Sequence, residues 1–235
     1  MRAALLLLLY TLTPVATSDE VHIAVAANFK QTAEVINAYF SHHSGHKVTS
    51  SSASTGTLHS QIVYGAPFDI LLSADSNSPQ SLLASGHGVT GTNNCYALGQ
   101  LALVGGNDVS ADMNNPGLSL SIANPATAPY GRAAQEVINK PEFAAGAGRK
   151  MVRGNSVVQA YQFWHSGSVD LALVARSLAP QDSALIPSNW YTAIEQHAVL
   201  LENGRSNQAA ILYMQMLRSQ PVQEIIGNAG YSNCP

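Results

Sequence analysis

The chain has 235 residues, a formal net charge of −3, and only 11% charged side chains. Because charged residues are few and the net charge is slightly negative, the chain has no basic stripe that could bind nucleic acid or an anionic membrane surface. The length suffices for one large domain or for two lobes of roughly 100 residues each, and either can bury a proper core.

The first 18 residues have the features of a secretory signal. They combine a basic start at Arg2, an apolar run over 3–9, and small residues at Ala16 and Ser18. The run is too short to span a bilayer, so we expect cleavage after Ser18 rather than a membrane anchor. No Cys stands near the cleavage point for acylation, and no later run is apolar enough to cross a membrane. The mature chain is therefore expected free in the periplasm or outside the cell, not membrane-inserted.

Beyond residue 18, short apolar runs alternate with segments whose apolar residues recur every three or four positions. The runs predict buried strands, and the recurring segments predict helices. Strands are expected at 21–26, 47–51, 68–72, 96–104, 118–123, around 151, 171–174 and 196–201. Helices are expected at 28–41, from 54 up to Gly65, and at 75–85, 130–139, 157–164, 207–218 and 221–227. This order predicts an α/β protein with parallel sheets and ligands at the carboxyl ends of the strands.

Four segments place small or hydroxyl-bearing residues where a strand or loop gives way to a helix. They are Ala-Ala-Asn-Phe at 26–29, Ser-Thr-Gly-Thr at 54–57, Ala-Pro-Tyr-Gly at 128–131 and Gly-Asn-Ser-Val at 154–157. The first turn of a helix has unpartnered N–H groups and a partial positive charge, so converging helix starts can hold an oxyanion without Lys, Arg or a metal. Taken singly, Asn28, Thr55 and Ser156 are ordinary helix-cap residue types.

The mature chain contains two cysteines, Cys95 and Cys234. An oxidising compartment allows them to pair, and a disulfide is the favoured interpretation. The alternative is two separate small residues, because the sequence does not show how close their Cβ atoms come. No Cys-x-x-Cys motif is present to indicate redox activity.

Five strings together resemble the periplasmic molybdate-binding proteins of ABC importers. They lie at 26–29, 65–75, 96–101, 129–131 and 225–231, and the match runs from about residue 21 to 231. The most distinctive is Gly-Ala-Pro-Phe-Asp at 65–69, followed by a strand and Ser-Ala-Asp at 73–75. The resemblance implies a two-lobed periplasmic binding protein of type II, with a mostly parallel, helix-flanked sheet in each lobe. It also implies molybdate or tungstate bound in the interlobe cleft, no catalysis, no cofactor, and delivery by a monomer to a permease and its ATPase.

We predict a first lobe of residues 19–94 plus 202–235 and a second lobe of residues 95–201. The chain is expected to cross between them near 96–98 and 196–199. Closure of the lobes around the ligand would follow from donors on both sides.

The resemblance also places the ligand contacts. They are expected at Ala27, Asn28, Ser54, Thr55, Tyr130, Ser156 and Val157. Tyr130 and Val157 would act through their backbone N–H groups. Some relatives use a Tyr hydroxyl on a strand of the second lobe where this chain has Ala175, so that hydrogen bond must be lost or replaced, with Asn28 as the candidate.

The physical demands of a tetrahedral dianion agree with this assignment. Its burial requires about six to eight hydrogen-bond donors, and each bond to a charged oxygen contributes roughly 1.5–3 kcal/mol. Monohydrogen phosphate would need an acceptor for its own proton, and no Asp or Glu stands at the expected contacts. The preference for molybdate over the smaller sulfate is implied by the resemblance alone.

Three alternatives remain at this stage. Another tetrahedral oxyanion, sulfate foremost, would use the same donors. A metal-binding protein would use the cluster of His42, His43 and His46, although no His-Glu-x-x-His or Cys-His pattern accompanies it. A periplasmic hydrolase would need a nucleophile motif, and neither Gly-x-Ser-x-Gly nor Ser-x-x-Lys occurs. Asp69 and Asp75 bracket a strand and are expected to be capping and turn residues.

Overall fold

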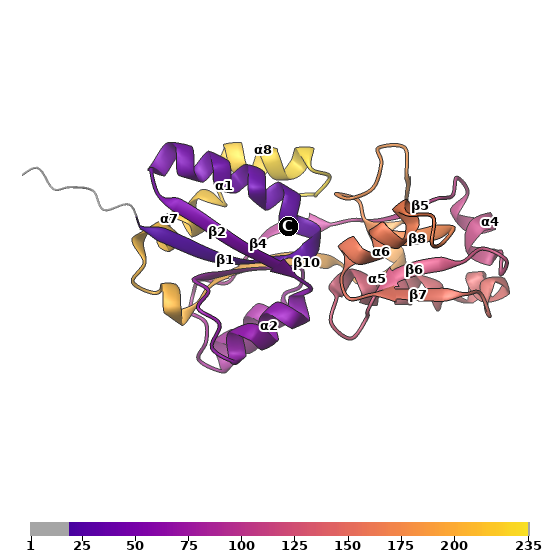
Figure 1. The fold of residues 1–235 in the computed structure, drawn as a ribbon, viewed down its shortest axis with the longest axis horizontal. Helices are drawn as coiled ribbons and strands as arrows, with labels where there is room; N and C mark the ends of the chain where they lie inside the picture. Colours follow the sequence, from indigo (N-terminus) through magenta and orange to yellow (C-terminus); the bar gives the residue numbers. More distant parts are fainter. Residues whose placement is uncertain (1–18, 235) are drawn as a thin grey trace, which may run out of the picture.

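The computed structural model describes residues 19–234, so the predicted signal sequence lies outside the described residues. Two five-stranded sheets lie side by side along the long axis of the molecule (Figure 1). The predicted α/β class with two helix-flanked, mostly parallel sheets is confirmed. No helix within 19–234 has the length and apolarity needed to cross a bilayer.

The first sheet has the strand order β2-β1-β3-β10-β4. Its strands are β1 (Glu20–Ala26), β2 (Lys47–Ala53), β3 (Ile70–Ser73), β4 (Asn94–Gly99) and β10 (Ile194–Leu200). The first three strands run parallel, and β10 is antiparallel to both β3 and β4. The central strand β3 is buried along its whole length, whereas the edge strand β2 is Ser-rich and largely exposed. Burial on both faces therefore explains the continuous apolar run of β3.

Helices cover both faces of this sheet. They are α1 (Lys30–Ser44), α2 (Thr55–Val63), α3 (Asn77–Ala84), α7 (Gln208–Met216) and α8 (Gln220–Asn228). Apolar residues of α1, α7 and α8 form one core on one face, and those of α2 and α3 form a second core on the other. Figure 1 shows α1 and α8 on the side of the sheet opposite α2. The predicted helices are present, each within a few residues of the expected ends.

The second sheet has the order β7-β6-β8-β5-β9. Its strands are β5 (Leu101–Val104), β6 (Leu120–Ala123), β7 (Met151–Gly154), β8 (Leu171–Ala175) and β9 (Ala184–Leu185), with helices α4 (Val109–Asn114), α5 (Pro129–Ile138) and α6 (Val157–His165). Strands β6, β7 and β8 are parallel, while β5 is antiparallel to β8. Neither α4 nor β9 was predicted, because six and two residues are too few to show a period.

The apolar run 96–104, predicted as one strand, is two strands. β4 belongs to the first sheet and β5 to the second, and Gln100 stands between them. The hydrophobic pattern is continuous because both halves are buried, but the hydrogen-bonding partners change at Gln100. The prediction of a single strand was therefore wrong in its connectivity.

The predicted boundaries between the lobes, at residues 94 and 201, do not coincide with the points where the chain passes from one sheet to the other. Both β4 and β10 pair within the first sheet, so 95–99 and 194–200 extend that sheet rather than the second. The reason is that the chain changes sheets between Gly99 and Leu101 on the outward path and between Leu185 and Ile194 on the return. The division of the chain into lobes otherwise stays a prediction.

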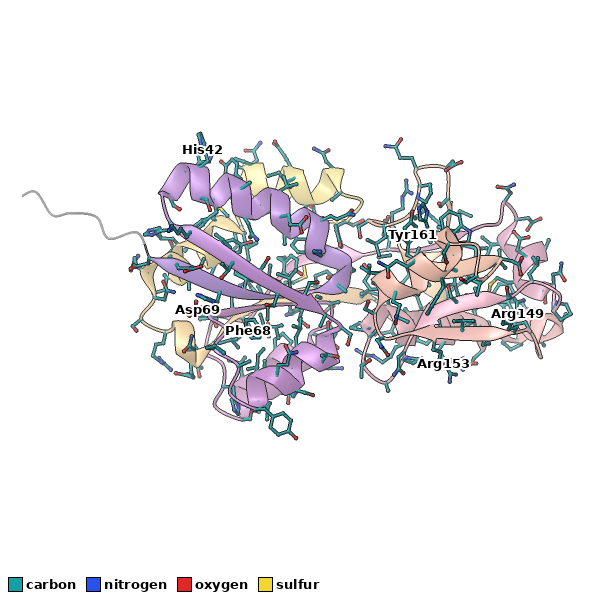
Figure 2. The ribbon with its side chains drawn as sticks, viewed as in Figure 1. His42, Phe68, Asp69, Arg149, Arg153 and Tyr161 are labelled. Carbon is teal, nitrogen blue, oxygen red and sulfur yellow. A yellow bond between two sulfur atoms is a disulfide. The ribbon has the colours of Figure 1, made fainter. Side chains whose placement is uncertain are left out.

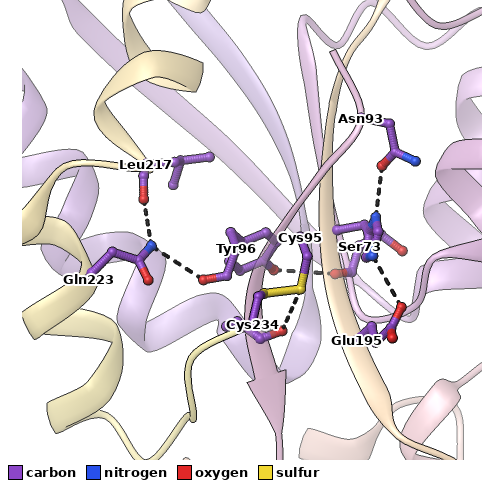
Figure 3. The surroundings of a disulfide bond; sticks show 10 residues. Ser73, Asn93, Cys95, Tyr96, Glu195, Leu217, Gln223 and Cys234 are labelled. Atoms are coloured by element: carbon purple, nitrogen blue, oxygen red, sulfur yellow. Dashed lines mark hydrogen bonds and ion pairs between the residues drawn. A yellow bond between two sulfur atoms is a disulfide. The ribbon is translucent and has the colours of Figure 1, made fainter. Parts of the chain in front are cut away.

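The C-terminal segment is held against β4. Cys95 and Cys234 form a disulfide with a Cα–Cα distance of 6.1 Å, closing a separation of 139 residues (Figure 3). Leu98 and Ser232 exchange two backbone hydrogen bonds of 2.7 and 2.9 Å. The C-terminal tail is therefore attached to β4 both by the disulfide and by backbone hydrogen bonds, close to the point where the chain passes to the second sheet.

Candidate functional site

A small cavity lies where the two sheets meet. Its walls consist of small residues and residues at helix starts from both sheets, namely Ala26, Ala27, Asn28, Ser54, Thr55, Ala74, Ala128, Pro129, Tyr130 and Val157. Strand register brings these segments together. Ala26 of β1 is level with Ala53 of β2, and Ala123 of β6 is level with Gly154 of β7. Each parallel pair therefore delivers two helix starts to the same sheet edge.

Asn28 belongs to a short 3-10 helix, η1 (Ala27–Phe29), that follows β1 and precedes α1. Its amide nitrogen donates to Gln196 Oε1 at 2.9 Å and to Tyr231 Oη at 3.1 Å. Because both amide hydrogens are used, the side chain has no donor left for a ligand. Replacement of the family Tyr hydroxyl by Asn28 stays a prediction, and in this arrangement it would need the Asn28 backbone rather than its side chain. Ala175 itself ends β8 beside Leu101 and is not part of the cavity wall.

Thr55 is the first residue of α2 and is buried. Its Oγ1 accepts a hydrogen bond of 3.1 Å from the N–H of Ala74, which fixes the side chain and leaves the hydroxyl hydrogen free to donate. The neighbouring Ser54 hydroxyl lies 2.8 Å from Thr57 Oγ1. The start of α2 thus presents an oriented hydroxyl donor to the cavity.

The second sheet contributes two helix starts. Tyr130 is the second residue of α5, after Pro129, and Val157 is the first residue of α6. Their N–H groups have no acceptor within residues 19–234, as expected for the first turn of a helix. Gly131 lets α5 begin tightly against β6, because a Cβ there would overlap the carbonyl of Ala123.

Ser156 does not line the cavity in this structure. Its hydroxyl accepts a hydrogen bond of 3.3 Å from Gln159 N–H and so caps α6. We therefore place Ser156 as the residue that holds the start of α6, while Val157 forms the wall. Ala26, Ala128 and Pro129 belong to the predicted segments 26–29 and 128–131 but were not among the expected ligand contacts, and they also line the wall. Ala74 is the wall residue outside all four segments, and an alanine side chain carries no donor that would have marked it.

The side chain of Tyr130 points away from the helix start toward the connection between the sheets. A Cβ at Gly99 would clash with its hydroxyl and would lie 2.8 Å from Gln196 Nε2. Neither polar atom has a hydrogen-bond partner of acceptable geometry in the described part of the chain. Burial raises the pKa of the Tyr130 phenol well above its ordinary value, so the group is neutral. The role of Tyr130 toward a ligand would be through its backbone.

Positive charge near the cavity comes from helix starts and not from side chains. No Lys, Arg or His of residues 19–234 forms part of its wall. Arg132 on α5 is committed to an ion pair of 2.5 Å with Asp75, a residue next to the wall residue Ala74. Arg149 lies toward the far end of the second lobe (Figure 2). The ion pair neutralises the carboxylate closest in sequence to the wall, which favours an anion in the cavity.

A larger cleft of about 320 Å³ also lies between the two sheets. Asp75, Arg132, Glu136 and Glu195 are among its lining residues. Three carboxylates against one paired guanidinium make this surface unfavourable for an anion. The small cavity is therefore the better candidate despite its size.

The remaining polar candidates have structural partners. His43 Nδ1 lies 2.8 Å from the carbonyl of Tyr39, and His46 Nδ1 accepts from Asp19 N–H at 3.2 Å. His42 stands at the end of α1 on the outer side of the first lobe (Figure 2). Asp69 accepts from the N–H of His22 at 2.8 Å. No group of three or more His, Cys, Asp or Glu suited to a metal ion occurs within residues 19–234.

Two sheets with paired helix starts facing one cavity are the architecture of a solute-binding protein. The family model described as bacterial extracellular solute-binding protein matches residues 21–232. The chain belongs to this family. It is accordingly a solute-binding protein and not an enzyme, so the hydrolase alternative falls away.

Within this family, the chain is similar to proteins named for molybdate binding. The chain is 38% identical over 229 residues to the molybdate-binding protein ModA of Azotobacter vinelandii, covering 92% of this chain and 91% of the relative. It is 36% identical over 225 residues to ModA of Rhodobacter capsulatus, covering 92% and 89%. The solved periplasmic molybdate-binding protein of Azotobacter vinelandii matches with a TM-score of 0.84 and 31% identity, covering 92% of this chain and all of that one. The resemblance inferred from the sequence is confirmed.

Proposed function

We propose that this protein binds molybdate or tungstate in the small cavity and delivers it to the permease of an ABC importer. The main support for this proposal is the composition of the cavity wall. Residues at helix starts, including Tyr130 and Val157 with N–H groups that lack an acceptor within residues 19–234, line a cavity together with Thr55, and its described wall contains no ionised side chain. The relatives named for molybdate binding support the choice of anion.

The donors come from both lobes. On the first lobe, the backbone of Ala27 and Asn28 and the hydroxyl of Thr55 would bind oxygens of the anion, with Ser54 closing the wall. On the second lobe, the N–H groups of Tyr130 and Val157 would bind the remaining oxygens. An anion that bridges the lobes has higher affinity for the closed form than for the open form, and this difference drives closure.

Selectivity follows from the same set of groups. A protonated phosphate needs an acceptor for its hydrogen, and the wall offers neither Asp nor Glu. Fully deprotonated tetrahedral anions need only donors. Sulfate shares this chemistry, so the comparison between sulfate and molybdate decides the identity of the solute.

The proposal also includes where the protein acts and which proteins it meets. We expect a periplasmic monomer, produced by cleavage after Ser18, that presents its closed form to a permease coupled to an ATPase. Molybdate would be the transported cargo rather than a cofactor.

Isothermal titration of the purified chain with molybdate, tungstate, sulfate and phosphate tests the proposal. We expect saturable binding of molybdate and tungstate at one site, much weaker binding of sulfate, and none of phosphate. Binding of sulfate that equals or exceeds that of molybdate would assign the protein to a different oxyanion. Absence of binding for all four anions would overturn the proposal.

A further inference from the structure

A buried polar cluster lies beside the cavity, where the two sheets and the C-terminal tail meet. We call Asn28, Ser177, Gln196 and Tyr231 the junction cluster. Asn28, Gln196 and Tyr231 expose 2%, 0% and 6% of their surface, respectively. Asn28 is the only member that also lines the cavity in the described part of the chain. The cluster therefore connects a residue of the proposed anion site to three segments distant in sequence.

Tyr231 is the centre of this cluster. Its hydroxyl donates to the carbonyl oxygen of Asn28 at 2.8 Å, accepts from Asn28 Nδ2 at 3.1 Å, and lies 3.0 Å from Ser177 Oγ. Ser177 Oγ in turn donates to the same Asn28 carbonyl at 3.1 Å. The Asn28 carbonyl is thus held by two hydroxyls, which fixes the orientation of the Asn28–Phe29 peptide within η1.

The two contacts of Ser177 cross between the lobes. Ser177 follows β8 in the second sheet, whereas Asn28 follows β1 in the first sheet. Tyr231 is attached to the first sheet through the neighbouring Ser232, which pairs with Leu98. Separation of the lobes would therefore break both contacts of Ser177 while leaving the bond between Tyr231 and Asn28 intact.

The position of Tyr231 is fixed by its surroundings. Its ring packs edge-on against Phe29, with centroids 5.3 Å apart. Three residues further on, Cys234 anchors the tail to β4 through the disulfide. A hydroxyl on a segment tethered in this way loses little conformational freedom when it forms its hydrogen bonds, so more of their free energy is retained.

We propose that Tyr231 and Ser177 form an interlobe clasp, in which the Tyr231 hydroxyl positions the Asn28 peptide at the anion site and meets Ser177 only when the lobes close. This inference rests on the proposed binding of an oxyanion. Both residues act through Asn28 and through closure, so they are positioning residues without a contact to the anion. Loss of the clasp would speed anion release, because release requires the lobes to open.

The test compares four variants of the full mature chain: Tyr231→Phe, Ser177→Ala, their double variant, and Tyr213→Phe as the matched control. Tyr213 is also a buried first-lobe tyrosine, and its hydroxyl donates to Asn37 Oδ1 at 2.7 Å, away from the second sheet. Molybdate affinity by titration and the release rate by stopped-flow tryptophan fluorescence are measured for each. The midpoint of thermal unfolding without molybdate gives the structural cost of each change.

We expect Tyr231→Phe and Ser177→Ala each to release molybdate roughly five- to tenfold faster, as the loss of one or two hydrogen bonds requires. The double variant should be less impaired than the product of the single effects, because the two hydroxyls share one contact. Tyr213→Phe should lower the unfolding midpoint without changing the release rate. A purely structural role would change the unfolding midpoint of both tyrosine variants alike and leave release unchanged.

Unchanged release in Tyr231→Phe, or independent effects of the two substitutions, would overturn the clasp while leaving oxyanion binding in place. Failure of the unmodified chain to bind molybdate would overturn the proposed function, and the clasp with it.

Discussion

At the scale of single residues, Thr55 has the most directly argued role. Its hydroxyl is oriented by the bond from Ala74 N–H, so its hydrogen is available to an oxygen of the anion. Neither Ala27 nor Val157 offers a comparable test, because both act through the backbone and a side-chain substitution keeps the N–H. Thr55 is therefore the residue at which mutation reports on the site.

We expect Thr55→Ala to weaken molybdate binding by about 1–3 kcal/mol, because one donor to a charged oxygen is lost. Thr55→Ser keeps the hydroxyl and should restore most of the affinity. Thr49→Ala is the control, since Thr49 is exposed on β2 and lies outside the cavity wall. Calorimetric titration measures all three. An affinity for Thr55→Ala equal to that of the unmodified chain would remove this hydroxyl from the site.

The buried tyrosines give a pH dependence at the same scale. Burial raises the pKa of Tyr231 to about 12 and raises the pKa of Tyr96 and Tyr130 well above their ordinary value near 10. A phenol with a raised pKa in the folded state contributes stability that is complete below pH 10 and is lost as the pH rises toward 12. We therefore expect the urea midpoint of unfolding to fall between pH 10 and 12. A midpoint that stays constant over this range would contradict the burial of these phenols.

At the scale of elements, the site depends on how the helix starts are seated. Gly99 is the last residue of β4 and lies directly against the side chain of Tyr130. Tyr130 is also the second residue of α5, so its backbone forms part of that helix start. Any group added at Gly99 must displace the end of the Tyr130 side chain, and the backbone of the same residue forms the start of α5. The connection between the sheets is thus coupled to the anion site by direct contact.

We expect Gly99→Ala to lower stability by about 1–3 kcal/mol through overpacking and to weaken molybdate binding as well. Gly227→Ala is the matched control, because no atom lies within 4 Å of a Cβ at that helical position. The control should be as stable as the unmodified chain or slightly more stable. Differential scanning fluorimetry with and without molybdate separates the two effects. A Gly99→Ala variant with normal affinity would show that the seat of Tyr130 is unimportant for binding.

The elements also show what the sequence could predict. Period and cap chemistry predicted the helix starts at Thr55, Tyr130 and Val157, because the signals for these starts are local. The break at Gln100 could not be predicted, since nothing in the apolar run 96–104 tells which sheet each half joins. The contacts of Asn28 with Gln196 and Tyr231 depend on residues 168 and 203 positions away, so only the folded chain reveals them.

At the scale of the whole molecule, the two lobes are joined by contacts of several kinds. The N–H of Gly56 on α2 donates to the carbonyl of Thr127 at 2.9 Å, and Arg132 pairs with Asp75. Both contacts link the first lobe to the second at the rim of the cavity. The closed arrangement therefore has its own stabilising contacts in addition to those expected from the anion.

The disulfide acts on the fold as a whole. A cross-link that closes a loop of 139 residues strongly restricts the unfolded chain. We expect the double substitution Cys95→Ser, Cys234→Ser to lower the free energy of unfolding by about 2–5 kcal/mol in denaturant titrations. Reductant should destabilise the unmodified chain by a similar amount and leave the double variant unchanged. Equal stability of the oxidised chain and the variant would show that the cross-link does not stabilise the fold.

The central claim is that an oxyanion is held between the lobes by peptide N–H and hydroxyl groups without a cation. A crystal structure of the chain grown with saturating molybdate, with molybdenum located from its anomalous signal, tests this most directly. We predict one molybdenum site enclosed by Asn28, Thr55, Tyr130 and Val157, with no guanidinium, ammonium or metal ion in contact with its oxygens. A cavity without molybdenum, or an anion bound by a basic side chain, would contradict the account.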